Sequence, residues 1–262
     1  MYYSERFIVA GGIFEYYKYG RLICTERIGV ASGGRKKNEN SVKYREDTFS
    51  KARKEVKRLI NANLNQWTDE EENRMTSKFL TLTFKENITD IKYANREFSK
   101  FIQRLSYNLA YKIKYLTVIE FQDGKTYKDK RTGELKKGLG RGAVHYHSVI
   151  FNMPYMPVKE LQAIWGHGFV KLNKIDDVDN VGAYVCKYMT KGDDERLIGQ
   201  KMYFKSTGLL QPEIINDYSQ VQEYKKAFAN DKPTFETEFE APFIGKIKYA
   251  QYNTNKIRKV VK

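Results

Sequence analysis

Residues 114–151 read KYLTVIEFQDGKTYKDKRTGELKKGLGRGAVHYHSVIF, and this stretch decides the fold. Its two ends, KYLTVIEF (114–121) and AVHYHSVIF (143–151), are rich in β-branched and aromatic residues, as β-strands are. The connection between them, residues 124–142, is rich in glycine and carries seven basic and two acidic residues. A glycine-rich connection between two strand patterns predicts a hairpin, so we expect the two strands to pair antiparallel.

Further strands and helices alternate around this hairpin. The patterns predict strands at 78–84, 169–175 and 202–208, and helices at 93–110, 158–166 and 181–191. The order is then β-α-β-β-α-β-α-β, which favours an α+β domain. We expect a central antiparallel sheet of about five strands with helices on one face.

The two flanks of this domain differ from it in pattern. We divide the chain into an N-terminal extension (1–75), a central domain (76–210) and a C-terminal extension (211–262). The first extension is expected to hold strands within 6–30 and a basic helix at 42–64. The last is expected to hold a helix at 211–231, strands within 234–252 and a basic tail.

Composition narrows the class of protein. The 262 residues include 47 Lys and Arg against 32 Asp and Glu, a net charge of +15. This excess favours a polyanionic partner, most commonly nucleic acid, over a neutral metabolic enzyme. No apolar run approaches the roughly 18 residues of a membrane span, and the N-terminus lacks the pattern of a secretory signal. Cys24 and Cys186 have no metal or redox spacing, which fits a cytoplasmic protein.

His145 and His147 are candidate metal ligands. Side chains two residues apart on a strand share one face, at about 7 Å, and can converge on one ion. Two structural histidines on a half-exposed sheet are the alternative. Glu120 in the preceding strand faces the hairpin partner and would complete a three-ligand site. The strand register is not fixed by the pattern, so Asp123 remains a competitor.

The segment 181–191 carries a second set of chemical groups. Tyr184, Lys187, Tyr188 and Lys191 fall at i, i+3, i+4 and i+7, which places them on one stripe of a helix. An ordinary amphipathic helix with two half-buried tyrosines is the bland interpretation. The doubled Tyr-x-x-Lys pattern shortly after a His-x-His strand favours a functional one.

Three segments taken together resemble a known family. FLTLTF (79–84), HYH (145–147) and YVCKYMTK (184–191) resemble the three motifs of the HUH endonucleases. The match is closest to the rolling-circle replication initiators of bacterial plasmids and single-stranded-DNA phages, in their two-tyrosine branch. The resemblance covers about residues 76–210 and implies the HUH/RRM-like, ferredoxin-like fold. It gives the strand 79–84 a mostly structural role at the centre of the sheet.

The resemblance implies a metal-assisted nicking and closing reaction on single-stranded DNA. His145, His147 and Glu120 correspond to the ligands of a divalent ion, Mn²⁺ or Mg²⁺. Tyr184 and Tyr188 correspond to the nucleophiles, and attack would give a 5′-phosphotyrosine bond and a free 3′-OH. We favour Tyr184 as the first nucleophile.

A tyrosine hydroxyl has a pKa near 10, so an enzyme must help it ionise at neutral pH. A neighbouring ammonium group, Lys187 or Lys191, can stabilise the phenolate and the charge on the phosphorus centre.

Other residues are candidates for DNA contacts. An aromatic ring mixed with cations suits single-stranded nucleic acid, and the connection 124–142 has both. It is a candidate binder of an origin hairpin, or else a solvated loop. His167 lies between a helix and a strand, either as a plain turn residue or as a phosphate contact. The candidates are Tyr127, Lys128, Lys130, Arg131 and His167.

The expected partners follow from the resemblance. They are single-stranded DNA at a replication origin, near a hairpin, together with a host helicase and polymerase. The chain has no Walker A loop for ATP-driven unwinding, so a helicase would have to be supplied by the host.

Three alternatives remain open at the level of sequence. A transposase or mobilisation relaxase would use the same chemistry, although relaxases tend to place the tyrosine before the histidines. A non-catalytic sheet could bind RNA or DNA by stacking bases on Tyr146 and other aromatic residues. A metal-free structural protein is the third.

Overall fold

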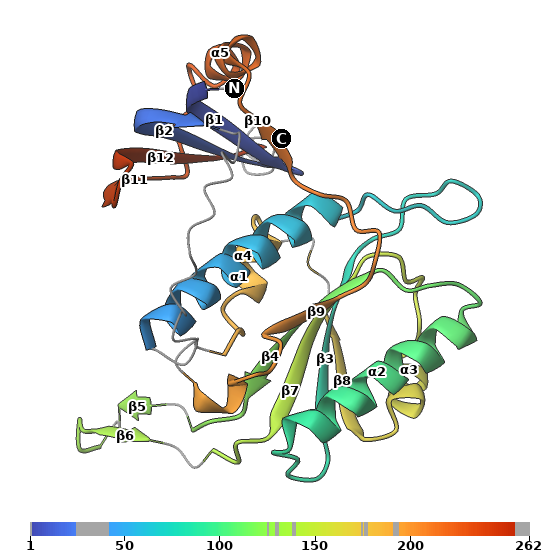
Figure 1. Ribbon diagram of the computed structural model, residues 1–262. Coiled ribbons are helices and arrows are strands. Elements are labelled where there is room, and N and C mark those ends of the chain that lie inside the picture. The colour runs from blue at the N-terminus through green and yellow to red at the C-terminus, as the bar shows by residue number, and fades with distance from the viewer. Residues whose placement is uncertain are drawn as a thin grey trace, which may run out of the picture.

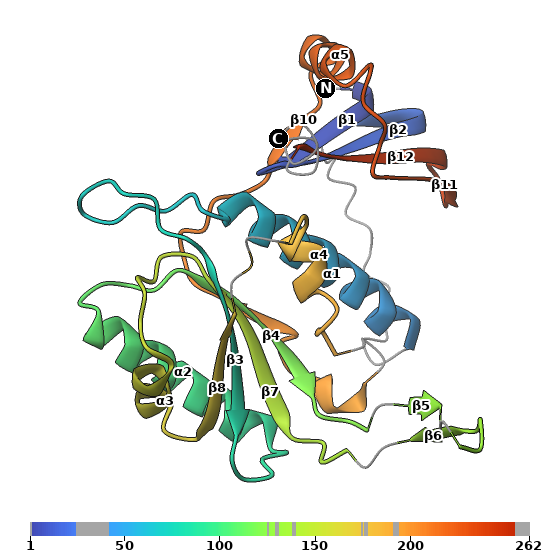
Figure 2. The same ribbon diagram turned by 180° about the vertical axis from the view of Figure 1, so that it is seen from behind.

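The structure of the protein is a computed structural model. It describes residues 2–24, 42–124, 126–128, 131–137, 140–173, 175, 178–190 and 194–254. Two five-stranded antiparallel sheets dominate it, one central and one built from the two ends of the chain (Figures 1 and 2). The expected α+β fold is therefore confirmed.

The central sheet has the strand order β8-β3-β7-β4-β9. Its strands are β3 (Lys78–Phe84), β4 (Tyr115–Phe121), β7 (Val144–Ile150), β8 (Gly168–Asn173) and β9 (Tyr203–Lys205). The histidine strand β7 lies in the middle, between β3 and β4. The predicted hairpin is present, and its connection contains the small ribbon of β5 (Thr126–Lys128) and β6 (Leu135–Lys137).

Helices cover both faces of this sheet, not one face as the sequence predicted (Figures 1 and 2). One face packs on α2 (Ile91–Asn108) and α3 (Val158–Trp165). The other packs on α1 (Val42–Asn63) and α4 (Val181–Val185). The physical reason lies in β7, where six of seven residues are buried. A strand buried on both sides needs two layers of cover, and the basic helix α1 supplies the second.

The helix α2 shows why these residues fold locally as they do. Asp90 caps its first turn by accepting hydrogen bonds from the backbone N–H groups of Lys92 and Tyr93. Phe98, Phe101 and Leu105 recur at helical spacing and are buried against the central sheet. This layer fixes one face of the sheet and leaves the other for α1 and α4.

The two ends of the chain form the second sheet, which we call the terminal sheet. Its order is β10-β1-β2-β12-β11. The strands are β1 (Tyr2–Ala10), β2 (Ile13–Cys24), β10 (Glu213–Ile215), β11 (Phe235–Ala241) and β12 (Gly245–Asn253). The helix α5 (Tyr218–Ala227) covers one face through Phe7, Val221 and Phe228. The extensions separated in the sequence analysis thus pair with each other.

Three expected elements differ from the observed ones. The helix expected at 211–231 is a short strand, β10, followed by α5, because Asp217 caps a new helix there. The helix expected at 181–191 ends at Val185, after five residues, and continues as turns. The expected basic tail lies beyond Thr254, outside the described residues.

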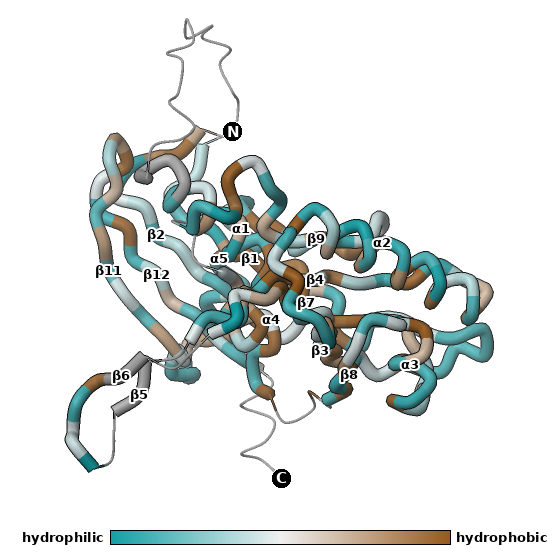
Figure 3. Tube along the Cα trace, turned by 90° about the horizontal axis from the view of Figure 1, so that it is seen from below, coloured by the Kyte–Doolittle hydropathy of each residue, from teal (hydrophilic) through white to brown (hydrophobic). Residues whose placement is uncertain are grey.

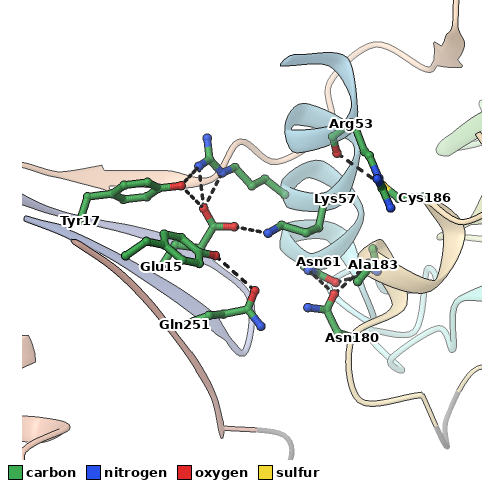
Figure 4. Close-up of polar contacts among 12 residues, drawn as sticks. Glu15, Tyr17, Arg53, Lys57, Asn61, Asn180, Ala183, Cys186 and Gln251 are labelled. Carbon is green, nitrogen blue, oxygen red and sulfur yellow. Dashed lines mark hydrogen bonds and ion pairs between the residues drawn. The ribbon is translucent and has the colours of Figure 1, made fainter. Parts of the chain in front are cut away.

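The helix α1 links the two sheets. From the terminal sheet, the buried carboxylate of Glu15 pairs with Lys57 at 2.7 Å and with Arg58 at 2.6 Å (Figure 4). Tyr17 donates to the same carboxylate at 3.1 Å. On its other side, α1 contacts α4. Any load on the terminal sheet therefore reaches α4 through one helix.

Candidate active site

Strand register brings the histidine pair and the glutamate together. On β7, His145 lies opposite Glu120 of β4 and Thr83 of β3. His147 lies opposite Thr81 of β3. All these side chains point toward the α1/α4 face, because strand side chains alternate and the neighbouring Tyr146 points toward α2.

His147 is held from both ring nitrogens. Its Nε2 lies 2.6 Å from Oε2 of Glu120, and its Nδ1 lies 3.2 Å from the hydroxyl of Thr81. The imidazole is nearly covered, whereas the Glu120 side chain is about one third exposed, at 34%. One end of the pair is thus fixed in the protein while the other opens to solvent.

His145 has a buried nitrogen without a partner. Its Nε2 is inaccessible to solvent and makes no hydrogen bond with the described residues. Burial lowers the pKa of His145, and the neighbouring His147 lowers it further, so the neutral form with a free lone pair is favoured. A neutral imidazole is the form that binds a metal.

The three side chains fit a divalent ion. One ligand atom from each of Glu120, His145 and His147 lies within 4.8 Å of the other two. Two imidazoles and a carboxylate are a donor set for first-row divalent metals, with open positions left for oxygen ligands. The orphaned Nε2 of His145 is the atom that such an ion would satisfy.

The segment carrying the tyrosines is anchored at both ends. Asn180 caps α4 by accepting from the N–H of Ala183 at 2.9 Å. After the helix ends, Thr190 donates to the carbonyl of Ile119 through both its N–H (3.1 Å) and its hydroxyl (2.9 Å). Because Ile119 adjoins Glu120 in β4, these bonds fix the turn of Tyr188 directly over the metal-ligating group.

The two tyrosine hydroxyls meet over the histidines. They lie 2.8 Å apart, within hydrogen-bond distance. The ring of Tyr188 stacks on His147, with centroids 4.1 Å apart, and both tyrosine rings pack on Phe79. Burial raises the pKa of Tyr188 to about 12, helped by the hydrogen bond to Tyr184 and the negative charge of Glu120.

The two lysines of the predicted stripe fare differently. The ammonium of Lys187 is exposed and lies 5.8 Å from the centroid of the Tyr184 ring. Lys191 lies outside the described residues.

His167 is not brought to this site. Its Nε2 lies 3.0 Å from a carboxylate oxygen of Glu97 on α2, and its ring packs on Trp165. It therefore belongs to the α2/α3 layer, on the other face of the sheet from the histidine pair.

The remaining candidates are not gathered at the site either. Asp123, the competitor of Glu120, is held by Arg196 at 2.6 Å. Arg131 is exposed in the hairpin connection. The side chains of Tyr127 and Lys128, and all of Lys130, lie outside the described part of the chain. Their roles in DNA binding stay predictions.

Tyr146 cannot stack on a nucleic acid base. Its side chain is fully buried, its ring stacks on Phe98 at 4.7 Å, and its hydroxyl donates to Asn95. The alternative in which the sheet binds bases through Tyr146 is therefore wrong, because α2 covers that face.

Sequence patterns missed the residues that hold the tyrosine segment. Asn61 of α1 accepts from the N–H of Gly182 at 3.0 Å and donates to Asn180 at 3.0 Å (Figure 4). A Cβ on Gly182 would stand 2.2 Å from the carbonyl oxygen of Lys57. Only a glycine allows this approach of α4 to α1. The Asn180 cap was visible in the sequence, but its partner more than 100 residues away was not.

The fold and the site together define a class. An antiparallel sheet with paired histidines on its central strand, a facing glutamate and tyrosines packed above them is the arrangement of an HUH-type endonuclease domain. Residues 77–193 match the model of the replication-associated protein family named for ORF2 and the gene 2 protein, and this segment belongs to that family of HUH-type phage replication initiators. The resemblance seen in the motifs is thereby confirmed.

Other comparisons add nothing to this assignment. No curated protein and no solved structure is significantly similar to the chain. Among the described residues, no helix is both long and apolar enough to pass through a membrane.

Proposed function

We propose that the protein initiates rolling-circle replication by nicking and rejoining single-stranded origin DNA through a tyrosine nucleophile. The observation that carries the proposal is the position of the paired tyrosine hydroxyls. They lie 2.8 Å apart in a turn whose Tyr188 ring stacks on a histidine of the metal-ligating group. A nucleophile and a cation site this close can act on one phosphate.

The residues of the chain divide the work of the reaction. Glu120, His145 and His147 would hold the ion, and Mn²⁺ suits their two imidazoles better than Mg²⁺, which prefers oxygen ligands. A bound divalent ion supplies Lewis-acid polarisation of the scissile phosphate. Thr81 and Glu120 hold the His147 ring in one orientation.

The covalent step conserves the energy of the DNA backbone. The tyrosine Oη attacks the phosphorus, the bond from phosphorus to the 3′ oxygen breaks, and the phenol proton ends on that 3′ oxygen. The products are a 5′-phosphotyrosine bond and a free 3′-OH, from which synthesis can start. Reversal by another 3′-OH rejoins the strand and restores the phenol.

Two adjacent nucleophiles suit a cycle of two transfers. We assign the first cleavage to Tyr184, since Lys187 lies beside its ring and places a positive charge near the developing phenolate. Tyr188 would then take the strand at termination, while Tyr184 is still linked to DNA. Unwinding and synthesis would come from a host helicase and polymerase.

The test is a cleavage assay with the full chain and single-stranded DNA from its own replicon. With Mn²⁺, we expect a protein–DNA band that survives SDS, and we expect EDTA to abolish it. The Tyr184→Phe/Tyr188→Phe double variant should give no band, while its rings still pack on Phe79. DNA binding without a covalent band in any divalent metal would refute the proposal.

A further inference from the structure

The terminal sheet has two faces of opposite character. One face is closed by α5, whose Val221 and Phe228 pack on Phe7 of β1. The other face carries a connected row of aromatic rings: Tyr3–Tyr19 at 5.8 Å, Tyr19–Tyr17 at 6.2 Å, Tyr17–Tyr249 at 4.9 Å and Tyr249–Phe235 at 6.0 Å. Phe239 continues the row, since it pairs with Ile247, which pairs with Tyr19. We call these six residues the aromatic face.

Only the inner part of the aromatic face is covered. Tyr17 lies against α1, where Arg58 donates to its hydroxyl at 2.9 Å. The outer part, on the edge strand β11, is open to solvent, with Phe235 55% and Phe239 43% exposed. Figure 3 shows β11 and β12 at the rim of the molecule. Exposed phenyl rings on an edge strand carry a risk of aggregation, so a ligand is the better explanation of their presence.

Charge is segregated across β11, whose sequence is FETEFEA. Phe235, Thr237 and Phe239 point to the aromatic face, and Glu236, Glu238 and Glu240 point to the opposite one, because side chains alternate along a strand. On the aromatic face of the described strands, the one carboxylate is Glu15, which is buried and paired with Lys57 and Arg58. A polyanion meets repulsion on one side of β11 and none on the other.

The helix α1 adds positive charge beside this face. Lys54 and Lys51 precede Arg58 by four and seven residues, so they lie on the side of α1 that faces the terminal sheet. Both are exposed. In Figure 1, the β11–β12 end of the sheet lies on the same side of the molecule as the N-terminal half of α1. Rings and ammonium groups therefore border one surface.

We infer that the aromatic face, with Lys51 and Lys54, binds single-stranded DNA outside the nicking site. Bases would stack on Phe235 and Phe239, and phosphates would contact the lysines. Duplex DNA hides the faces of its bases, so the rings offer it nothing. The choice of DNA as occupant rests on the proposed function. The surface lies outside residues 77–193, so it is an addition to the family domain.

Binding without cleavage is the direct test. Fluorescence anisotropy in EDTA would follow a labelled thymidine oligonucleotide of about 20 nucleotides, longer than the roughly 4–16 that such a fold covers. The Phe235→Ala/Phe239→Ala variant of the full chain should bind it at least about tenfold more weakly, since each stacked ring contributes measurably. Its affinity for the matching duplex should stay within twofold of the original.

Two further variants separate stacking from apolar contact. Phe235→Tyr/Phe239→Tyr should bind like the original chain, and Phe235→Leu/Phe239→Leu should bind as weakly as the alanine variant. Tyr107→Ala is the matched control, because it removes a 90% exposed ring from α2 on the central domain. That control should leave the affinity unchanged.

Several results would overturn the inference. They are unchanged binding by the alanine variant, full binding by the leucine variant, or an equal loss for the duplex. A change of oligomeric state alone, seen by light scattering, would instead make this face a contact between copies. Failure of the nicking reaction would leave the EDTA measurement intact, so the two proposals can fail separately.

Discussion

The ring of Tyr188 lies on the imidazole of His147, with centroids 4.1 Å apart and planes inclined by 24°. The same imidazole contacts Glu120 through Nε2 and Thr81 through Nδ1. A candidate nucleophile and a candidate metal ligand therefore share one packed unit. Removing the hydroxyl of Tyr188 and removing its ring are two different experiments.

The first prediction separates the two hydroxyls. Tyr184→Phe should lower the first cleavage by at least about 100-fold, because a covalent nucleophile has no substitute. Tyr188→Phe should keep first cleavage and stacking on His147 but lose transfer to a second strand. Single-turnover cleavage and strand-transfer assays would measure both, with exposed Tyr155→Phe as control. Equal first-cleavage rates in both single variants would contradict the assignment of Tyr184.

The second prediction concerns the orientation of His147. Thr81→Val removes the hydroxyl 3.2 Å from Nδ1 while keeping the shape of the side chain. Such a partner of a ligating histidine is worth about 10- to 100-fold in metal affinity. Isothermal titration with Mn²⁺ should therefore show a loss of about tenfold or more.

Thr83→Val is the matched control for this experiment. Thr83 lies two residues along the same strand, opposite His145. Equal Mn²⁺ affinity in the two variants would show that Thr81 does not orient the ligand.

The third prediction tests the seat of α4 on α1. Gly182→Ala places a Cβ 2.2 Å from the carbonyl oxygen of Lys57, so α4 must move away. Asn61→Ala removes the acceptor of the Gly182 N–H. Both variants should cleave DNA about tenfold more slowly or worse, as small displacements of a nucleophile do. Their Mn²⁺ affinity should be unchanged, because all three ligands lie on β4 and β7.

Ala183→Ser, at a half-buried neighbour, is the control for that pair of variants. Asn61→Asp should recover part of the rate, since it keeps an acceptor for Gly182. Normal cleavage by Gly182→Ala would mean that α1 does not position the tyrosines.

The fourth prediction concerns the link between the sheets. Burial opposes ionisation of Glu15, but the pairs with Lys57 and Arg58 outweigh it, and the pKa of Glu15 lies below its ordinary 4.5. Removing one partner of a buried pair costs about 3–5 kcal/mol. Urea unfolding at neutral pH should show about 3 kcal/mol less stability for Glu15→Gln.

The pH dependence of that difference has a definite sign. A carboxylate with a lowered folded pKa stabilises the protein above its unfolded pKa, and the effect is lost as pH falls through the folded value. The gap between the original chain and Glu15→Gln should therefore be full above pH 4.5 and narrow below it. A gap that is constant across this range would show that the charge of Glu15 is not what matters.

Much of the central sheet was predictable because its information is local. The strand 143–151, with two histidines on one face, and the facing strand 114–121 are visible as alternation, and β7 and β4 form there. The pairing of Glu120 with His145 was expected only as one possibility. A connection of more than 20 residues does not set strand register, which depends on packing of both faces.

What escaped the sequence depends on contacts between distant segments. The pairing of β2 with β12 joins residues more than 200 positions apart, and no periodicity reports it. The role of Asn61 depends on α1 covering the second face of the sheet. The helix at 181–191 was overextended because the spacing of its tyrosines and lysines is helical. Its end at Val185 lets Thr190 bind the carbonyl of Ile119.

The most direct test of the central claim is to locate the covalent bond to DNA. Lys187 lies between the two tyrosines, so trypsin separates Tyr184, in residues 175–187, from Tyr188, in residues 188–191. After reaction with Mn²⁺ and single-stranded origin DNA, mass spectrometry should find nucleotide on the peptide of Tyr184, and none when EDTA is present. Nicked DNA with no nucleotide on either peptide would contradict the account.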